Sequence, residues 1–308
     1  MRRIAITGAC GNLGWKLLCH LVQQSYVDQV FGIGLDLPTD DQRHELSQFG
    51  GHAKATFVQS DLTDLQDRRW CELIEQSDGV VHFAAQNPFP EATWNDATHS
   101  LDMTLNVANA AVLAGVQRFV FASSNHVMGR YKDAPLRETV APGELTTDLD
   151  HAVGTVWSAG DTAMDSTIYA VAKSCGERAC RALAFQSAGD TEFVSTRIGW
   201  CQPGANHPST LSSAGTPTQN SSASMNEDHE ATRNDRWFKS MWLSNRDFLQ
   251  LFSHALFADS SAWPAPSIVV NAMSRNEQMP WSLKEARDWL GYEPDDGFSF
   301  SASSVSSV

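Results

Sequence analysis

The chain has 308 residues and a formal net charge of −14 at pH 7, with a pI near 5.0. This length allows a sizeable core, organised as one large domain or as one domain with a small lobe. The acidic charge argues against nucleic acid or an anionic membrane surface as the main partner. It does not argue against an anionic substrate, because a single pocket can be basic on an acidic protein.

The six cysteines are scattered and form no Cys-x-x-Cys pair. In a chain of this length without a secretory signal, they predict reduced thiols and no metal site. No apolar stretch approaches the roughly 18 residues that a membrane-spanning helix needs. We therefore expect a cytoplasmic protein with no membrane partner.

The N-terminal stretch has the pattern of a strand, a tight turn and a helix. A β-branched run at residues 4–7 is followed by Gly8, Gly11 and Gly14, and then by an apolar helical pattern. Gly8 permits the sharp turn, Gly11 lets the backbone approach a pyrophosphate, and Gly14 lets the helix pack closely on the sheet. The pattern predicts a dinucleotide site, with a purely structural loop as the alternative.

The start of this helix and the end of the next strand would hold two parts of the same ligand. Backbone N–H groups at Asn12 and Leu13 would face the phosphates, aided by the helix dipole. The next predicted strand, residues 30–36, ends in Asp36. A carboxylate there can accept hydrogen bonds from both adenosine ribose hydroxyls and repels a 2′-phosphate, which predicts NAD rather than NADP. The alternative is an aspartate that only ends the strand.

Alternating strand and helix patterns continue along the chain. Further strands are predicted at 55–58, 79–85, 117–124, 192–199 and 267–270, and helices at 65–75, 97–115, 168–187, from Ser244 or Asn245 onward, and at 283–290. This alternation predicts an α/β protein of the Rossmann type, with a doubly wound parallel sheet and its ligands at the carboxyl ends of the strands.

The same patterns suggest the domain organisation. We expect one domain over 1–292, with a core at 1–199 and a small C-terminal substrate lobe at 200–292. Residues 130–165 have little periodicity and predict a lid or substrate loop. A polar stretch at about 205–235 predicts a flexible insertion, and 293–308 a disordered tail.

A catalytic pair follows from helix geometry. Tyr169 and Lys173 are four residues apart on a predicted helix, so they share one face. A tyrosine has a pKa near 10, and a nearby ammonium together with a positively charged nicotinamide would lower it. Tyr169 would then act as a base, Lys173 would also hold the nicotinamide ribose, and a serine at a strand end, Ser123 or Ser124, would orient the reacting oxygen.

These motifs, in this order, resemble the extended short-chain dehydrogenase/reductase (NAD-dependent epimerase/dehydratase) superfamily. The resemblance rests on the spacing Gly-x-x-Gly-x-x-Gly at 8–14 and on Tyr-x-x-x-Lys at 169–173. It implies NAD as cofactor, adenine contacts from Asp61 and Leu62, and a small-residue loop with Ala84 and Ala85 passing under the cofactor. It also implies a possible homodimer through the helix that carries the tyrosine.

The superfamily pattern Ser-x-x-Val-x-Gly selects Ser124 over Ser123 as the catalytic serine. Dehydratases of the superfamily carry an acidic group just after this serine, whereas this chain has Asn125 and His126. The resemblance therefore argues against dehydration.

A narrower resemblance is to the uronate dehydrogenases and related sugar dehydrogenases. It rests on Phe-Ala-Ser-Ser-Asn-His at 121–126 and Arg-Ile-Gly-x-Cys-x-Pro at 197–203. It implies that a tyrosine removes the proton of the sugar C1 hydroxyl while a hydride passes to NAD, which yields a lactone. Asn125 and His126 would contact the sugar.

Three positions depart from that family. Trp200 replaces a serine that helps to bind the uronate carboxylate, and Asn87 stands where the family has a serine facing the substrate. Arg236 comes nearest to the family's carboxylate-binding arginine, with Arg233 as the other candidate and a solvated loop arginine as the alternative. We expect a small sugar or uronate as substrate; an epimerase that retains NAD and a non-catalytic nucleotide sensor remain as alternatives.

Overall fold

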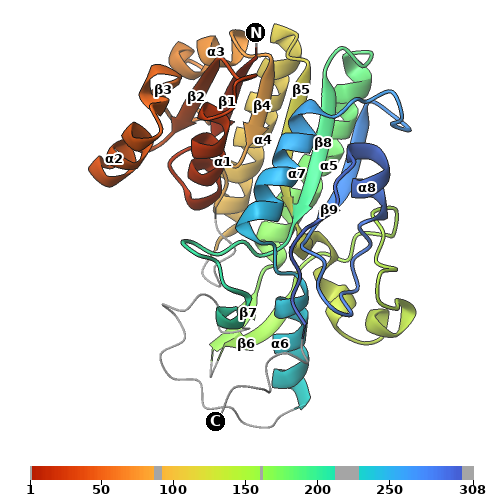
Figure 1. Ribbon diagram of the computed structural model, residues 1–308. Helices are drawn as coiled ribbons and strands as arrows, with labels where there is room; N and C mark the ends of the chain where they lie inside the picture. The colour runs from red at the N-terminus through yellow and green to blue at the C-terminus, as the bar shows by residue number, and fades with distance from the viewer. Residues whose placement is uncertain (1, 87–91, 160–161, 212–228, 300–308) are drawn as a thin grey trace.

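The computed structural model describes residues 2–86, 92–159, 162–211 and 229–299, and it is built around a seven-stranded parallel sheet (Figure 1). The strands are β1 (Arg3–Thr7), β2 (Gln29–Gly34), β3 (Ala55–Gln59), β4 (Gly79–His82), β5 (Arg118–Ser124), β8 (Glu192–Ile198) and β9 (Ser267–Ala272). Their order, β3-β2-β1-β4-β5-β8-β9, places β1 between β2 and β4. This order confirms the predicted doubly wound sheet and opens a crevice at the carboxyl ends of β1 and β4.

Helices cover both faces of the sheet (Figure 1). One apolar layer contains α1 (Asn12–Val22), α7 (Asn245–Phe257) and α8 (Lys284–Leu290), and the other contains α3 (Arg68–Glu75), α4 (Trp94–Ala114) and α5 (Thr167–Gln186). Because both faces of the sheet are covered, adjacent residues of a central strand, such as Val80 and Val81, are both fully buried. Within the described ranges, no helix has the length and apolar character needed to cross a membrane.

Shorter elements complete the chain. They are α2 (Asp40–Gln48), β6 (Val156–Ala159), β7 (Thr162–Asp165), α6 (His229–Ser240) and the 3₁₀ segments Gly51–Ala53, Asn125–Lys132, Leu136–Thr139 and Pro208–Thr210. Strands β6 and β7 pair in an antiparallel hairpin, which lies beside α6 beyond the carboxyl ends of the sheet (Figure 1). Trp157, Phe238 and Trp281 are buried in a third apolar cluster in this region.

The hairpin and α6 differ from the sequence expectation. The segment 130–165 has little periodicity, and its hairpin is stabilised by packing of Trp157 rather than by a regular pattern. The polar stretch at 205–235 was expected to be a flexible insertion, but 229–235 begin α6 because the helix buries Trp237 and Phe238 further along. The middle of that stretch, 212–228, lies outside the described residues.

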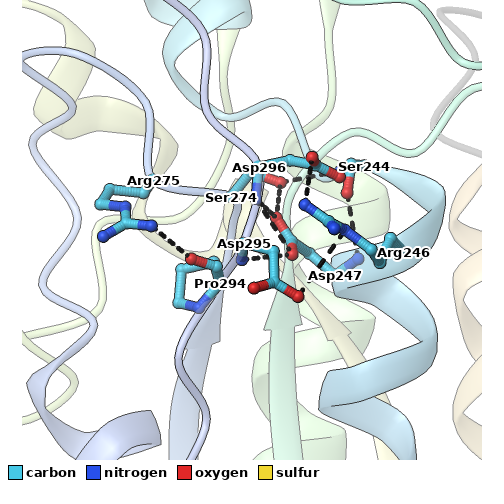
Figure 2. A network of polar contacts seen from close by, with 8 residues as sticks. All are labelled: Ser244, Arg246, Asp247, Ser274, Arg275, Pro294, Asp295 and Asp296. Atoms are coloured by element: carbon cyan, nitrogen blue, oxygen red, sulfur yellow. Dashed lines mark hydrogen bonds and ion pairs between the residues drawn. The ribbon is translucent and has the colours of Figure 1, made fainter.

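Residues 293–299 do not form the expected disordered tail, because the buried carboxylate of Asp247 binds their backbone (Figure 2). Its Oδ1 accepts hydrogen bonds from the backbone N–H groups of Asp295 at 2.8 Å and Asp296 at 3.4 Å. Its Oδ2 accepts one from the Ser274 hydroxyl at 2.5 Å. Arg246 adds an ion pair to Asp296 at 2.7 Å. Residues 300–308 lie outside the described part of the chain.

We predict that Asp247→Ala lowers the free energy of unfolding by about 2–4 kcal/mol, because several buried donors lose their acceptor at once. Urea denaturation followed by circular dichroism measures this change. Asp190→Asn, at an exposed carboxylate, is the control and should change the stability by no more than about 0.5 kcal/mol. Equal stability of the two variants would contradict the anchoring role of Asp247.

Candidate active site

The glycine loop after β1 is too tightly packed for a side chain at Gly8 or Gly14. Gly8 has φ of +65°, and a Cβ on it would lie 3.0 Å from the backbone nitrogen of Ala84. A Cβ on Gly14 would lie 2.3 Å from the carbonyl oxygen of Gly8. At Gly11, by contrast, the nearest atom would be 3.2 Å away. The loop therefore brings β1 and α1 into direct backbone contact and leaves the outer side of Gly11 without a side chain.

The first turn of α1 is suited to an anion. Its N-cap residue, Gly11, contributes no side-chain cap, so the N–H groups that begin at Asn12 and Leu13 have no acceptor from it. The Asn12 side chain donates instead to the backbone oxygen of Cys201 at 2.9 Å, which holds the start of the helix in place. An uncapped helix N-terminus beside a glycine loop fits the pyrophosphate of a dinucleotide.

Asp36 lies exposed just beyond β2. Burial, and then the charge of Asp36, raise the pKa of Cys10, so the carboxylate lies close to the glycine loop. Asp61 is also exposed after β3 and accepts a hydrogen bond from the backbone N–H of Thr63 at 2.9 Å. Leu62 packs its side chain into the core. Three strand ends thus bring the expected cofactor residues to one edge of the sheet.

Ala84 and Ala85 follow β4 at the same edge and are both partly buried. The backbone N–H of Ala84 donates to the Thr7 hydroxyl at 3.3 Å. The same hydroxyl lies 2.8 Å from Nδ1 of His82, which is fully buried and whose pKa burial lowers to about 3. His82 is therefore a neutral core histidine, and it supports the small-residue loop.

Ser124, Tyr169 and Lys173 come together at the end of β5. The Ser124 hydroxyl lies close enough to the phenol of Tyr169 to lower its pKa. The Lys173 ammonium lies 5.6 Å from the centre of the Tyr169 ring and donates to the backbone oxygen of Ala122 at 2.6 Å. Ser123 faces the other way and donates to the Glu177 carboxylate at 2.5 Å. Because successive side chains of a strand point to opposite faces, this favours Ser124 as the serine that faces the tyrosine.

The electrostatics of the tyrosine differ from the expectation. Burial raises the pKa of Tyr169 to about 12, and only the neighbouring Ser124 hydroxyl opposes this rise. Burial also lowers the pKa of Lys173 to about 8. In the protein alone, Lys173 therefore does not produce the expected low pKa of the tyrosine, because its ammonium is itself desolvated and directed to a backbone oxygen.

Asn125 and His126 begin the segment after β5. The Asn125 side-chain nitrogen donates to the backbone oxygen of Ile198 at 2.9 Å, while its Oδ1 is buried without a partner among the described residues. His126 lies edge-on to Tyr169, with 6.0 Å between ring centres. Its Nδ1 is 2.7 Å from the Thr155 hydroxyl, and burial lowers its pKa to about 4. His126 is therefore neutral at pH 7.

A row of aromatic rings continues from His126 away from the tyrosine. Trp157 of β6 stacks on His126 at 6.0 Å, Phe238 of α6 meets Trp157 at 5.1 Å, and Trp200 meets Phe238 at 5.2 Å. Sequence reasoning identified Trp200 but missed Trp157 and Phe238. Trp157 lies in the non-periodic stretch, and its own aromatic side chain was the signal that could have drawn attention to it. The indole N–H of Trp157 is buried without a partner among the described residues.

Arg236 does not join this arrangement. Arg236 is exposed on α6, two residues before Phe238 and so on another face of the helix. Its guanidinium donates to the side-chain oxygen of Gln278 at 2.9 Å. Asn87 lies outside the described residues.

Comparisons with known proteins identify the family of this chain. Residues 4–201 match the NAD dependent epimerase/dehydratase family. L-arabinose 1-dehydrogenase (NAD(P)(+)) of Haloferax volcanii is 30% identical over 96% of this chain and 97% of its own. Uronate dehydrogenase of Pseudomonas syringae pv. tomato is 26% identical over 96% of this chain and 82% of its own.

Among solved structures, one titled "Mutated Uronate Dehydrogenase" has a TM-score of 0.64 and 24% identity, and the match covers 96% of this chain and 82% of that chain. This likeness supports the fold. The family match spans the glycine loop, the ends of β1 to β5 and the segment that carries Ser124, Tyr169 and Lys173. The chain belongs to the NAD dependent epimerase/dehydratase family.

Proposed function

We propose that the protein is an NAD-dependent dehydrogenase that oxidises the C1 hydroxyl of a small sugar to a lactone. The observation that carries this proposal is the approach of Ser124 and Lys173 to Tyr169 at the carboxyl end of β5. Two relatives that match almost the whole chain are sugar dehydrogenases by name, which supports the same chemistry.

In the proposed reaction, Ser124 holds the C1 hydroxyl oxygen and Tyr169 accepts its proton. The bound NAD supplies the acceptor for the hydride that leaves C1, so the C1–O bond becomes the lactone carbonyl. Lys173 stabilises the tyrosinate and contacts the nicotinamide ribose. Because burial raises the pKa of Tyr169, the nearby positive charge is needed to make it a base at neutral pH.

The remaining proposed contacts are uncharged. The free Oδ1 of Asn125 can accept a hydrogen bond from a sugar hydroxyl, and the Trp157 N–H can donate one. His126 is neutral, and Trp200 offers an aromatic face to the apolar side of a sugar ring. Gly8, Gly11, Gly14, Asp36, Asp61, Leu62, Ala84 and Ala85 form the proposed NAD contacts.

The cations of this region are already engaged, which favours a neutral aldose over a uronate or a sugar phosphate. Lys132 is buried and donates to Asp133 at 2.7 Å, and Arg233 lies 3.8 Å from the same carboxylate. Arg236 donates to Gln278. The sequences of 87–91 and 212–228 contain no lysine, arginine or histidine, so these segments add no cation. Among the described side chains here, a carboxylate or phosphate on the substrate would meet only cations that already lie beside an acidic or amide group, although the Nε of Arg233 has no hydrogen-bond partner.

A homodimer is part of the proposal. Helices α4 and α5 pack side by side, and α4 carries apolar side chains in solvent, namely Leu105 at 39% and Leu113 at 79% exposure. A second copy of these helices would cover them.

The preferred substrate can be identified by turnover. Purified protein with NAD should form NADH with neutral aldoses such as L-arabinose or glucose, and at least about tenfold more slowly with galacturonate or glucose 6-phosphate. Absorbance at the NADH band measures both rates. Faster turnover of the charged sugars, abolished by Arg236→Gln, would contradict the neutral-aldose proposal and make that arginine the carboxylate partner. An epimerase would release no stoichiometric NADH.

The second prediction concerns the base. Tyr169→Phe should lower kcat by about 10² to 10⁴-fold, because it removes the group that accepts the C1 proton. NAD binding, measured by calorimetry, should stay within a few-fold of the original value. Tyr26→Phe, at an exposed tyrosine that packs on Phe257, is the matched control and should leave kcat unchanged. Full turnover by the Tyr169 variant would contradict the proposed base and would indicate a non-catalytic role for this residue.

The third prediction concerns the glycine loop. Gly14→Ala should weaken NAD binding at least about tenfold, because its Cβ would collide with the Gly8 carbonyl and displace the loop. Gly115→Ala is a control for general destabilisation: it forces a side chain into φ of +69° at the end of α4, with no atom within 4 Å. NAD affinity should be unaltered in that variant. Equal NAD affinities in the two variants would argue against the loop as the phosphate site.

A further inference from the structure

A cavity of about 610 Å³ lies apart from the ring row and the glycine loop. It is bounded by α5, the edge strand β9, the segment 147–151 and the end of α8, which Figure 1 shows side by side. Its walls include Glu177, Arg178, Arg181, Arg197, Val269 and Trp289. This volume is in the range of pockets that bind small molecules.

Two arginines on one side of α5 reach this cavity without a partner. Arg178 and Arg181 are exposed and three residues apart, so their side chains are neighbours on the helix. Neither guanidinium makes a hydrogen bond or ion pair with any of the residues that the structure describes. They stand out in a chain with a net charge of −14, since most of its other arginines and lysines are bound to acidic groups or backbone oxygens.

A third arginine lies in the wall with one donor unused. Arg197 is 1% exposed, and Glu177 accepts from its Nε at 3.0 Å and from its Nη2 at 2.9 Å. Nη2 also lies 2.8 Å from Nε2 of His151. The remaining nitrogen, Nη1, is buried without an acceptor among the described residues. A buried donor left without a partner is costly, so an acceptor in this cavity would stabilise the fold.

The acidic groups of the wall do not cancel the positive charges of Arg178 and Arg181. Glu177 is neutralised by Arg197, and its pKa falls to about 2, chiefly through hydrogen bonds and charge from His151 and Arg197, which outweigh its burial. Asp148 is exposed and accepts the hydroxyl hydrogen bond of Thr146. The two free arginines therefore leave the cavity with a local positive excess.

Part of the cavity wall is apolar. Val269 of β9, Pro264 and the partly buried ring of Trp289 contribute this surface. A ligand that fits both sides would carry an anionic group at one end and an apolar body at the other.

We propose that this cavity is a second binding site, for a small organic anion that carries a carboxylate or a phosphate on an apolar body. The planar guanidinium forks of Arg178 and Arg181 bind either group in a bidentate manner, and the apolar body lies against Trp289 and Val269. The site is distinct from the sugar site but joined to it. Glu177 accepts from Ser123, the residue directly before Ser124.

Calorimetry with purified full-length protein tests this proposal, with NAD at saturation so that the glycine loop cannot take up the probe. Phenyl phosphate and benzoate represent the two anionic groups, and benzyl alcohol is the neutral analogue. We expect at least one of the anions to bind with one equivalent per chain and the alcohol not to bind. The tighter anion identifies the group that the site prefers.

The double variant Arg178→Gln/Arg181→Gln should bind the anion at least about tenfold more weakly, since two charge-assisted contacts are lost. Its thermal midpoint should not change, because neither side chain has a partner to lose. Arg137→Gln, at another exposed arginine outside the cavity, is the matched control and should bind normally. Absence of binding by both anions, equal binding by the double variant, or equal binding of benzyl alcohol would overturn the proposal.

Discussion

The contact between the Gly8 carbonyl and the α-carbon of Gly14 determines how the rest of the molecule is placed. A side chain at Gly14 would lie 2.3 Å from that oxygen, so only glycine lets α1 start directly beneath the end of β1. This contact turns the free N–H groups of the first helical turn toward the crevice between β1 and β4. The left-handed conformation of Gly8 then brings Ala84 against the same loop. The proposed cofactor site is thus a consequence of backbone packing more than of any one side chain.

Polar contacts between β5 and α5 hold the reacting groups in place. Lys173 bonds to the backbone of β5 at Ala122, and Glu177, one turn later on the helix, binds Ser123 and Arg197. Because Ser123 is held on one side of the strand, Ser124 faces the other side, where Tyr169 lies. Breaking one of these buried pairs would leave a buried charge without a partner, which is energetically costly. The arrangement is therefore rigid. The same network forms part of the wall of the anion cavity.

The substrate region combines an aromatic row with few available charges. Trp157, Phe238 and Trp200 come from three separate parts of the chain and meet only because β6 and α6 pack beyond the sheet. Their rings exclude water, and the unpaired groups left among them, on Asn125 and Trp157, are uncharged. Such surroundings favour hydroxyl groups over anions, because a buried charge without a partner is costly. The arginines without partners lie instead at the cavity behind α5.

The sequence alone determined the alternation of strands and helices, the glycine loop and the Tyr169–Lys173 pair, because these depend on local periodicity and on spacing within one element. It could not supply the β6–β7 hairpin, α6 or the ordered segment 293–299, which are stabilised by contacts between residues far apart in the chain, such as Asp247 with Asp295. It also ranked Arg236 as a substrate contact, whereas helix geometry directs that side chain to Gln278. The sequence predicted that Lys173 and a bound nicotinamide together lower the pKa of Tyr169; in the protein alone burial raises that pKa, and burial is a property that only the tertiary structure decides.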